Sequence, residues 1–331
     1  MDDPVTAALA DAFPDRTVAE LVGVGPSWNG GNETVGVAFA DGRRAYLKVA
    51  VEGDGSRIGR ERAVLDHVAA RGVVPVPRVL TADPNASIPY LATAPAPGRD
   101  LLEVYETADT DRERESLLRG VGRALAALHE ERFEGHGEIT GGRGETGLEL
   151  DPGSWTDVLL ATVERTREIS TTDRLADHFT AVIDCIEENR DRLDDAPAAL
   201  LHGDIAKPNA FVVDGGGGAG AERDHSRVGL LDWELAHVGD PARDLVRARD
   251  QLCNDFDNEG PERFGQAVYG GYRERAGTLP DGFAEREPVY RVVRVLGRSG
   301  FLDQWETYLD TPREELEERI EAELEERIAA V

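Results

Sequence analysis

The sequence predicts an α+β fold with two lobes, a small β-rich N-terminal lobe over residues 1–95 and a larger, mainly helical C-terminal lobe over residues 96–331. Three observations lead to this prediction. Short runs of β-branched and aromatic residues fill much of the first lobe, apolar residues at helical spacing dominate from residue 112 onward, and the segment Ala94–Gly98 (APAPG) lies between them. Because proline and glycine interrupt regular structure, we expect Ala94–Gly98 to link the lobes.

The N-terminal lobe is expected to contain a β-hairpin, one helix and two further strands. Asp41-Gly42 is a typical hairpin turn between the first two strands. The helix carries its apolar residues on one face and is stopped by Gly72, after which the prolines of residues 73–77 keep the chain extended. The expected elements are, in chain order, Thr34–Ala40, Arg44–Ala50, Ser56–Arg71, Arg78–Ala82 and Ile88–Ala94.

The C-terminal lobe is expected to consist of helices interrupted by one β-region. Gly141–Gly147 predicts a flexible loop, and Asp214–Ser226 predicts a mobile hairpin tip within the β-region. Thr311-Pro312 predicts a capping box at the start of the last helix, whose apolar stripe packs on its own domain or, alternatively, against a second copy of the chain. The expected elements are helices over residues 112–130, 154–168 and 173–192, a β-region over 199–213 and 227–233, and mainly helices after residue 240.

The composition argues against several classes of protein. The chain has 65 acidic and 37 basic residues and a formal net charge of -28, so neither nucleic acid nor an anionic membrane is an expected partner. No apolar run approaches the ~18 residues of a membrane span, and the acidic start does not resemble a signal peptide. We therefore expect a cytoplasmic protein with a solvated acidic surface, as in proteins adapted to high salt. Two cysteines without CxxC spacing predict neither a disulfide framework nor a zinc site.

Lysine is almost absent from the chain. Lys48 and Lys207 are the only lysines, and the other 35 basic residues are arginines. A compact ammonium group and a planar guanidinium group do not substitute freely for each other in a tuned site. The two lysines are therefore candidate functional residues.

The strongest chemical signal is the segment Leu201–Asn209 (LHGDIAKPN), which lies between two short β-type runs. Asp204 on such a loop can accept a proton from a substrate hydroxyl, and Asn209 can return to the same pocket and ligate magnesium. A buried strand ending at Asp232 places a second carboxylate at the edge of this cleft. Because magnesium prefers oxygen ligands, the pattern indicates phosphoryl transfer.

The order of these motifs resembles that of a known superfamily. HGDxxxxN is followed by Asp-Trp-Glu at residues 232–234 and by Gly-Asp-Pro-Ala-Arg-Asp-Leu at residues 239–245. This arrangement resembles the aminoglycoside phosphotransferase/choline kinase superfamily, and the resemblance extends from about Asn29 to about Arg247. It implies a two-lobed protein-kinase-like fold.

The resemblance also implies roles for residues of the C-terminal lobe. Asp204 would be the catalytic base, and Asn209 and Asp232 would hold Mg²⁺. Three further residues would be structural, with His202 supporting the catalytic loop, Asp240 lying in the following turn and Asp244 bracing the loop from the next helix.

Lys207 departs from the family pattern, because it occupies a position of the catalytic loop that varies among relatives. It would contact the transferred phosphate, and the alternative is an ion pair with a surface acid.

By the same resemblance the N-terminal lobe binds ATP. Lys48 would contact the phosphates and Glu61 would pair with it; the alternative is that Glu61 is an exposed helix carboxylate, with Glu52 and Asp66 as competing partners. The remaining nucleotide contacts would come from the loop that covers the phosphates and the hinge that meets adenine, namely Gly30, Gly31, Asn32, Leu91, Ala92 and Thr93.

These residues predict an ATP- and Mg²⁺-dependent transfer of the γ-phosphate to a hydroxyl of a small molecule of the amino alcohol, aminoglycoside or sugar type. One alternative is a protein kinase on the same fold, although DWE stands where protein kinases have DFG and no APE-type segment follows. A second is a non-catalytic nucleotide-binding module, and a third is an acyl- or nucleotidyl-transfer enzyme, for which no GxSxG is present. We expect a monomer or homodimer. A cationic acceptor could be lined by Asp255, Asp257, Tyr269, Tyr272, Trp305 and Tyr308.

Overall fold

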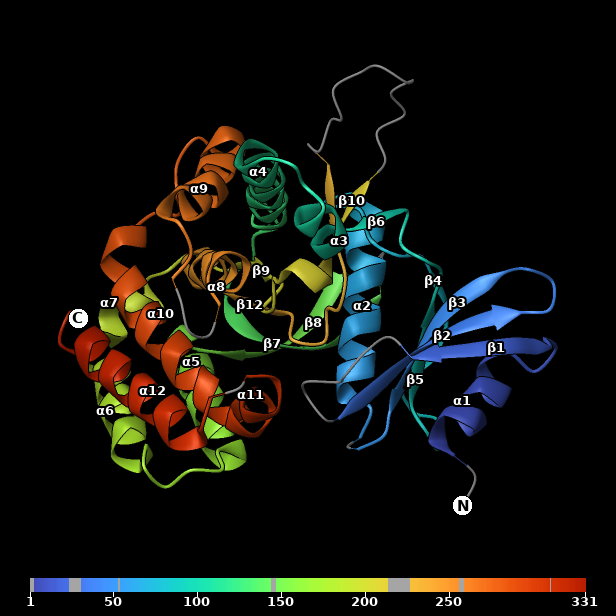
Figure 1. Cartoon of the computed structure of the whole chain (residues 1–331), viewed down its shortest axis with the longest axis horizontal. Coiled ribbons are helices and arrows are strands. Elements are labelled where there is room, and N and C mark those ends of the chain that lie inside the picture. Colours follow the sequence, from blue (N-terminus) through green and yellow to red (C-terminus); the bar gives the residue numbers. More distant parts are fainter. Residues whose placement is uncertain are drawn as a thin grey trace.

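The computed structural model of the chain describes residues 3–23, 31–52, 54–143, 147–213, 227–255, 259–309 and 311–331. Figure 1 shows a lobe that contains a twisted sheet beside a larger lobe made mainly of helices. The predicted α+β fold with a small β-rich N-terminal lobe is therefore confirmed.

The N-terminal lobe is built on a five-stranded antiparallel sheet in the order β1-β2-β3-β5-β4. Helix α1 (Pro4–Ala12) packs on this sheet, and its buried Val5 and Ala8 join the core formed by the strands. Neither α1 nor β1 was expected, because β1 is exposed over most of its length and shows no alternation of apolar and polar residues. The strands are β1 (Val18–Gly23), β2 (Asn32–Phe39), β3 (Arg44–Ala50), β4 (Val79–Asp83) and β5 (Tyr90–Thr93).

The predicted hairpin and helix of this lobe are both confirmed. Strands β2 and β3 pair through the turn at Asp41-Gly42, where Gly42 has a φ of 82°. Helix α2 (Ser56–Arg71) has the predicted bounds and ends at Gly72, which adopts the left-handed conformation that favours glycine. Figure 1 shows α2 between the sheet and the helices of the larger lobe, so that α2 can position side chains at the cleft.

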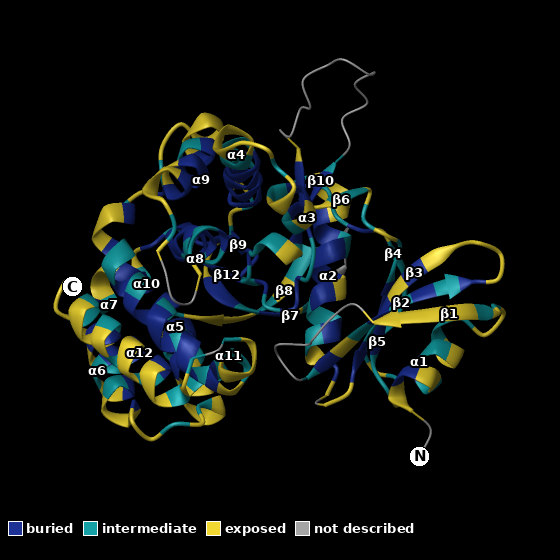
Figure 2. Cartoon of the chain, in the orientation of Figure 1, coloured by how far each residue is buried: buried dark blue, intermediate teal, exposed yellow. Residues whose placement is uncertain are grey.

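The C-terminal lobe surrounds helix α8, which is buried along most of its length (Figure 2). Its N-terminal residue Pro241 follows Asp240, whose side chain accepts a hydrogen bond from the amide of Ala242. The helices of this lobe are α3 (Leu101–Glu106), α4 (Asp111–Leu128), α5 (Trp155–Ile169), α6 (Ala176–Glu188), α7 (Arg190–Asp194), α8 (Pro241–Cys253), α9 (Glu262–Ala276), α10 (Phe283–Arg298), α11 (Leu302–Tyr308) and α12 (Arg313–Ile328), with short 3-10 turns at Lys207–Asn209 and Ser299–Phe301.

Two small antiparallel sheets accompany these helices. One has the order β11-β10-β6, and the other has the order β8-β7-β12-β9. Strand β6 begins at Gly98, so the proposed lobe boundary at residues 95 and 96 falls between the last strand of the N-terminal sheet and the first strand of the C-terminal lobe. The strands are β6 (Gly98–Asp100), β7 (His136–Arg143), β8 (Gly147–Gly153), β9 (Ala199–Leu201), β10 (Ala210–Val213), β11 (Val228–Leu230) and β12 (His237–Gly239).

The prediction of a loop at Gly141–Gly147 is wrong over its described residues. Residues 141–143 end β7 and Gly147 begins β8, and the two strands pair from His136 to Gly153. The error has a physical reason: the ends of this hairpin are glycine-rich, Gly142 and Gly147 have φ values of 133° and 89°, and the register shifts beside Ile139. The predicted hairpin tip at Asp214–Ser226 lies outside the described residues.

The last helix differs from its prediction only at its start. Helix α12 begins at Arg313, its cap is Pro312 and no side chain caps it, so the predicted capping box at Thr311 does not form. The carbonyl of Pro312 instead accepts from the amides of Glu315 and Leu316. The apolar stripe Leu316, Ile320 and Leu324 is buried in the core of the lobe, which confirms packing on its own domain.

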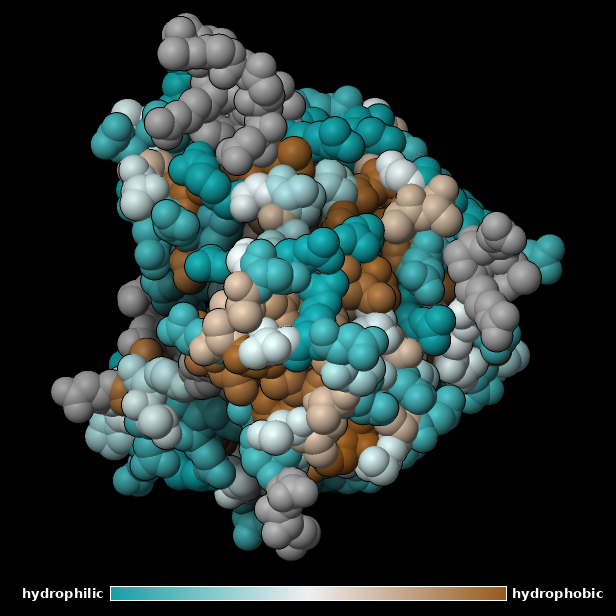
Figure 3. Space-filling model, turned by 90° about the vertical axis from the view of Figure 1, so that its right-hand side faces the viewer, coloured by the Kyte–Doolittle hydropathy of each residue, from teal (hydrophilic) through white to brown (hydrophobic). Residues whose placement is uncertain are grey.

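The surface of the N-terminal lobe mixes hydrophilic and apolar residues. Figure 3 views this end of the molecule, where hydrophilic residues interrupt the apolar patches. Leu21 and Val22 on β1 are among the exposed large apolar residues. Within the described ranges, no helix is both long enough and apolar enough to cross a membrane.

Candidate active site

The segment that carries Asp204 is a tight loop between β9 and the 3-10 turn Lys207–Asn209. Gly203 adopts a φ of 81°, and a Cβ atom there would lie 2.4 Å from the carbonyl oxygen of Leu235. Only glycine combines this left-handed backbone with such a close approach. Backbone geometry thereby explains the glycine of the His-Gly-Asp motif.

The carboxylate of Asp244, on α8, binds the backbone of this loop. Its two carboxylate oxygens accept from the amides of His202 and Gly203, each at 2.9 Å, and His129 lies 3.3 Å away. Burial alone would raise the pKa of Asp244, but the hydrogen bonds from His129 and from the loop hold it below its usual value. Asp244 therefore braces the loop as an anion. His129, at the end of α4, was not predicted because no sequence spacing connects it to the motif.

His202 joins the loop to the segment that carries Asp232. Its Nε2 donates to the carbonyl of Leu231 at 2.8 Å, and its Nδ1 accepts from the amide of Asp204 at 3.2 Å. Its ring packs against the buried Trp233, with centroids 4.5 Å apart. Burial lowers the pKa of His202, so the neutral ring required by this pair of hydrogen bonds is favoured.

Asp204 is held by two side chains that sequence reasoning missed. Nη2 of Arg247 and Nε2 of Gln251 both lie 2.8 Å from Oδ1 of Asp204, while Asn209 donates to the Asp204 carbonyl at 2.9 Å. Burial favours a raised pKa, but Arg247 and Gln251 outweigh it and lower the pKa of Asp204. The carboxylate of Asp204 is thus kept ionised.

The only signal that could have found Arg247 and Gln251 is their spacing on α8. Arg247 follows Asp244 by three residues and Gln251 follows Arg247 by four, so one side of the helix presents all three toward the loop that carries Asp204.

Asp232 has an unusual backbone conformation. Among the described residues it is the one non-glycine residue with a positive φ, at 60°. Strained conformations of this kind persist only where the surroundings enforce them. The amide of Leu231 donates to the carbonyl of Asn209 at 2.9 Å, which holds the Asp232 segment beside the loop that carries Asp204. The side chain of Asp232 is 34% exposed and faces the cleft.

Lys48 is surrounded by three carboxylates. Its Nζ lies 2.6 Å from Glu61, 2.5 Å from Asp232 and 3.4 Å from Glu234. Although burial opposes its charge, these carboxylates raise the pKa of Lys48. Burial raises the pKa of Glu61 to about 7 despite the attraction of Lys48, because several carboxylates share one cation.

The Lys48–Glu61 pair therefore forms, and neither Glu52 nor Asp66 takes the place of Glu61 at Lys48 in the structure. Glu234 was missed, although it lies within the recognised Asp-Trp-Glu motif. Its Oε2 also accepts from Nδ2 of Asn32 at 2.6 Å, so Asn32 is tied to the C-terminal lobe.

A cavity of about 400 Å³ lies between the lobes beside these residues. This volume is in the range of small-molecule sites. Leu91 and Thr93 line it, whereas Ala92 is fully buried in the sheet core. The charged and polar side chains that line it include Lys48, Glu61, Asn209 and Asp232.

The remaining predicted residues have different surroundings. The carbonyl of Gly31 accepts from the amides of Val51 and Glu52, and Gly30 lies outside the described residues. Nζ of Lys207 lies 4.8 Å from the ring centroid of Tyr105, a cation–π contact, and burial lowers its pKa. Asp240 accepts from Arg286 at 2.6 Å and from Tyr290 at 2.5 Å, and is fully buried.

The aromatic residues suggested for a cationic pocket are not gathered at Asp204. Tyr269 and Tyr272 are buried in the core of the lobe, where Tyr272 contacts His129 at 3.2 Å. Tyr308 is half exposed at the end of α11, and Asp257 lies outside the described residues.

Asn209 and Asp232 offer a donor set that fits Mg²⁺. Nδ2 of Asn209 is engaged by Asp204, which leaves its Oδ1 as the ligating oxygen, and the partly exposed carboxylate of Asp232 borders the same cavity. Two protein oxygens with further ligands from phosphate and water suit magnesium.

The two lobes, the cavity between them and the carboxylate loop beneath it define a kinase-type phosphotransferase. Residues 27–279 match the Phosphotransferase enzyme family. The chain therefore belongs to this family and is a small-molecule kinase. No curated protein matches the chain.

Solved structures share the fold along nearly the whole chain. An aminoglycoside-3'-phosphotransferase of type VIII is 20% identical with a TM-score of 0.61, over 91% of this chain and 99% of that one. The streptomycin–ATP–APH(2")-IIa ternary complex is 17% identical with a TM-score of 0.57, over 98% and 96%. Choline kinase LicA from Streptococcus pneumoniae is 13% identical with a TM-score of 0.59, over 99% and 98%. At these identities the likeness concerns the fold alone.

Proposed function

We propose that the protein transfers the γ-phosphate of ATP to a hydroxyl group of a small molecule. The observation that carries the proposal is the position of Asp204, an ionised carboxylate on the loop that also supplies Asn209, beside a cavity bordered by Lys48 and Asp232. Phosphoryl transfer requires a base, a metal and a phosphate-binding cation around one line of attack. This site brings together candidates for all three roles.

In the proposed reaction the nucleotide lies in the interlobe cavity. Lys48, oriented by Glu61, contacts its phosphates, and the backbone of residues 91–93 lies at the side where the base would stack. Gly31 and Asn32 lie at the start of the β2–β3 hairpin that would cover the phosphates. Structures of this fold have been solved as an ATP complex and as a GDP complex, so the fold supports a nucleotide in this place and does not select ATP over GTP.

Asn209 and Asp232 would hold Mg²⁺, which neutralises phosphate charge when bound. Asp204 would orient the acceptor hydroxyl and accept its proton as the new bond to phosphorus forms. His202, Asp240 and Asp244 would keep the loop in place through the contacts described above. Lys207 would contact the transferred phosphate, and its ammonium group would have to move away from the ring of Tyr105 to do so. The protein would act in the cytoplasm, as a monomer or homodimer.

The proposal is tested with Asp204→Ala in an assay of ADP release against a panel of alcohols, amino alcohols, hydroxy acids, sugars, sugar acids and aminoglycosides. Acceptor-dependent turnover should fall at least about 100-fold, the usual contribution of a positioned general base, while ATP binding is retained. Turnover at the wild-type rate would exclude Asp204 as the base.

A non-catalytic nucleotide-binding module is the second candidate on the same fold. It predicts ATP binding without Asp204-dependent turnover with any acceptor of the panel. The complete set of Lys48, Glu61, Asp204, Asn209 and Asp232 favours catalysis instead.

A further inference from the structure

Helix α8 carries a row of nitrogen donors on one side, and two of them donate to Asp204. Arg243, Arg247 and Gln251 follow one another at four-residue spacing, so they share one side of the helix. Nε of Arg247 donates to Oε1 of Gln251 at 3.0 Å, and both residues donate to the same oxygen of Asp204. An acceptor whose hydroxyl reaches Asp204 must therefore lie within reach of Arg247.

Arg243, one turn before Arg247, is buried, and the nearby carboxylate of Asp244 attracts it without forming an ion pair with it. Its side chain donates Nη1 to Nε2 of His237 at 3.1 Å, and within the described part of the chain no carboxylate pairs with it. His237 does not supply a negative charge, because its Nδ1 donates to the carbonyl of Leu235 and burial lowers its pKa to about 3. Burial and the proximity of Arg247 lower the pKa of Arg243 to about 10, so it remains charged at neutral pH.

Two more arginines converge on the same place from other helices. Arg60 of α2 and Arg165 of α5 both pair with Glu138, at 3.3 Å and 2.5 Å. Glu138 stands opposite His237 in the pairing of β7 with β12. The partners of Arg60, Arg165 and Arg243 are therefore adjacent residues on neighbouring strands.

These four residues, Arg60, Arg165, Arg243 and Arg247, form what we call the arginine cluster. Their guanidinium groups are paired with only two carboxylates of the described chain, Glu138 and Asp204. The nearby Asp244 has both oxygens engaged by loop amides and His129. In a chain with a formal charge of -28, these four arginines thus outnumber the carboxylates that form ion pairs with them.

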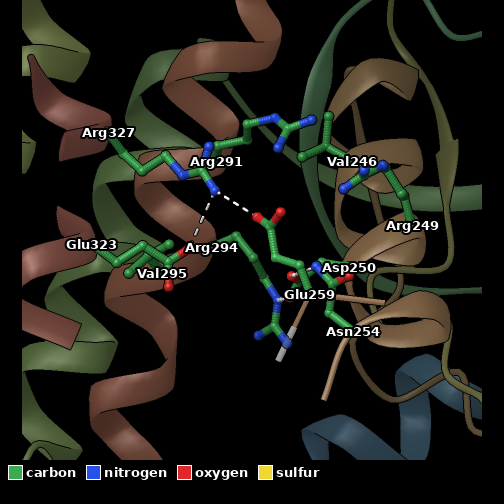
Figure 4. A pocket seen from close by; sticks show the side chains of 10 residues that line it. All are labelled: Val246, Arg249, Asp250, Asn254, Glu259, Arg291, Arg294, Val295, Glu323 and Arg327. Atoms are coloured by element: carbon green, nitrogen blue, oxygen red, sulfur yellow. Dashed lines mark hydrogen bonds and ion pairs between the residues drawn. The ribbon is translucent and has the colours of Figure 1, made fainter. Parts of the chain in front are cut away.

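Another group of arginines shows how such residues are usually accommodated here. Between α8, α10 and α12, Figure 4 shows several arginines around a small pocket, interleaved with Asp250, Glu259 and Glu323. Arg294 pairs with Asp250 at 2.6 Å, and Arg327 pairs with Glu259 at 2.9 Å. On α8 itself, Arg249 pairs with Glu262 at 2.6 Å, so the lack of an ion-paired carboxylate is a feature of Arg243 and not of α8 as a whole.

We propose that the phosphate acceptor carries an anionic group, a carboxylate or a phosphate, which binds to the arginine cluster while its hydroxyl meets Asp204. The inference rests on the proposed function, because it names the substrate class of that site. Arginine forks bind carboxylates and phosphates through paired, charge-assisted hydrogen bonds. A polycationic acceptor such as an aminoglycoside would meet like charges at the same position.

The proposal is tested by measuring binding, which does not depend on turnover. Two matched sets of hydroxyl compounds are titrated calorimetrically into the full chain with Mg²⁺ and a non-hydrolysable ATP analogue. The first set is glycerate, glycerol and 3-amino-1,2-propanediol, and the second is glucuronate, glucose and glucosamine. The acid of a set should bind at least about tenfold more tightly than its neutral and amino counterparts, the effect of one charge-assisted hydrogen bond.

A matched pair of variants assigns the preference to the cluster. Arg165→Gln should abolish most of it, whereas Arg167→Gln, on the same helix and paired with Glu164 at 3.0 Å, should retain it. Both arginines are substantially exposed, at 54% and 41%, so both variants should fold. The proposal would be overturned by equal binding within both sets, by tighter binding of the amines or by no binding of either acid. It would also be overturned if the two variants had an equal effect. Whether the proposed function itself fails is decided separately, by the ADP-release assay that compares Asp204→Ala with the wild type.

Discussion

Nζ of Lys48 lies 2.5 Å from Oδ1 of Asp232, so an ion pair joins the N-terminal sheet to the C-terminal lobe across the cavity. The same ammonium group contacts Glu61 and Glu234. One cation thus holds three carboxylates together. A nucleotide that engages Lys48 and a metal that engages Asp232 would exchange this ion pair for their own contacts, which couples ligand binding to the joint between the lobes.

Replacing Lys48 by methionine should destabilise the protein more at pH 8 than at pH 5.5. Without the lysine, the pKa of Glu61, already about 7, rises further above its unfolded value. A carboxyl whose folded pKa is raised binds more protons in the folded state, so its contribution to stability is lost as pH rises through the folded pKa. Urea denaturation at the two pH values measures the difference. Lys207→Met, which removes a cation–π contact instead, serves as the control and should show no such pH dependence. An equal loss of stability at both pH values in Lys48→Met would contradict this account.

Replacing Arg247 by glutamine should move the acid limb of the pH–activity profile to higher pH. Burial favours the protonated form of Asp204 and Arg247 opposes it, so removal of Arg247 raises the pKa of the base. Since the proposed reaction needs the carboxylate, kcat/KM should begin to fall at a higher pH in the variant than in the wild type. If Arg247 acted only on the transferred phosphate, activity would fall by the same factor at every pH. An unshifted acid limb would therefore rule out its role in holding Asp204 ionised.

Much of this site could be predicted because its residues are local in sequence. Asp204 and Asn209 belong to one loop and its 3-10 turn, and Asp232 ends the strand segment that follows. The bounds of α2 were predicted because an apolar face and a terminal glycine are short-range signals. At these positions a few consecutive residues determine the conformation, whereas the short-range signals at Gly141–Gly147 and at Thr311 predicted the wrong local structure.

The contacts that were missed depend on distant segments. Arg247 and Gln251 look like ordinary polar positions of a helix until α8 is packed beneath the loop 43 and 47 residues earlier in the chain. His129 meets Asp244 across 115 residues. Helix periodicity identifies which side of α8 these residues share, but not which loop that side faces. The arginine cluster could not be predicted for the same reason, because its members come from three helices that are distant in the sequence.

Gly203→Ala should reduce both stability and activity. The substitution would place a Cβ atom 2.4 Å from the carbonyl of Leu235 in a backbone with a φ of 81°. Gly277→Ala is a matched control, because Gly277 has a φ of 84° but nothing within 4 Å of its would-be Cβ. The backbone strain that both variants share costs of order 1–3 kcal/mol of stability. Gly203→Ala should lose more stability than Gly277→Ala, by the cost of the clash, and it should be the one variant of the two that impairs turnover. Thermal denaturation and ADP release check this, and equal behaviour of the two variants would contradict it.

Asp240→Ala should cost far more stability than the removal of an exposed acid. The carboxylate of Asp240 is fully buried, accepts from Arg286 and Tyr290, and caps α8 through Ala242. Its loss leaves the buried guanidinium of Arg286 without its partner, which typically costs about 3–5 kcal/mol. Asp303→Ala breaks an ion pair with Arg313 at 2.5 Å, but Asp303 is 56% exposed, so its effect should stay below about 1 kcal/mol. Urea denaturation of the two variants at neutral pH measures both values. Because Asp240 also fixes the start of the helix that bears Asp244 and Arg247, a small effect of Asp240→Ala would mean that α8 is positioned by its apolar packing and not by this buried ion pair.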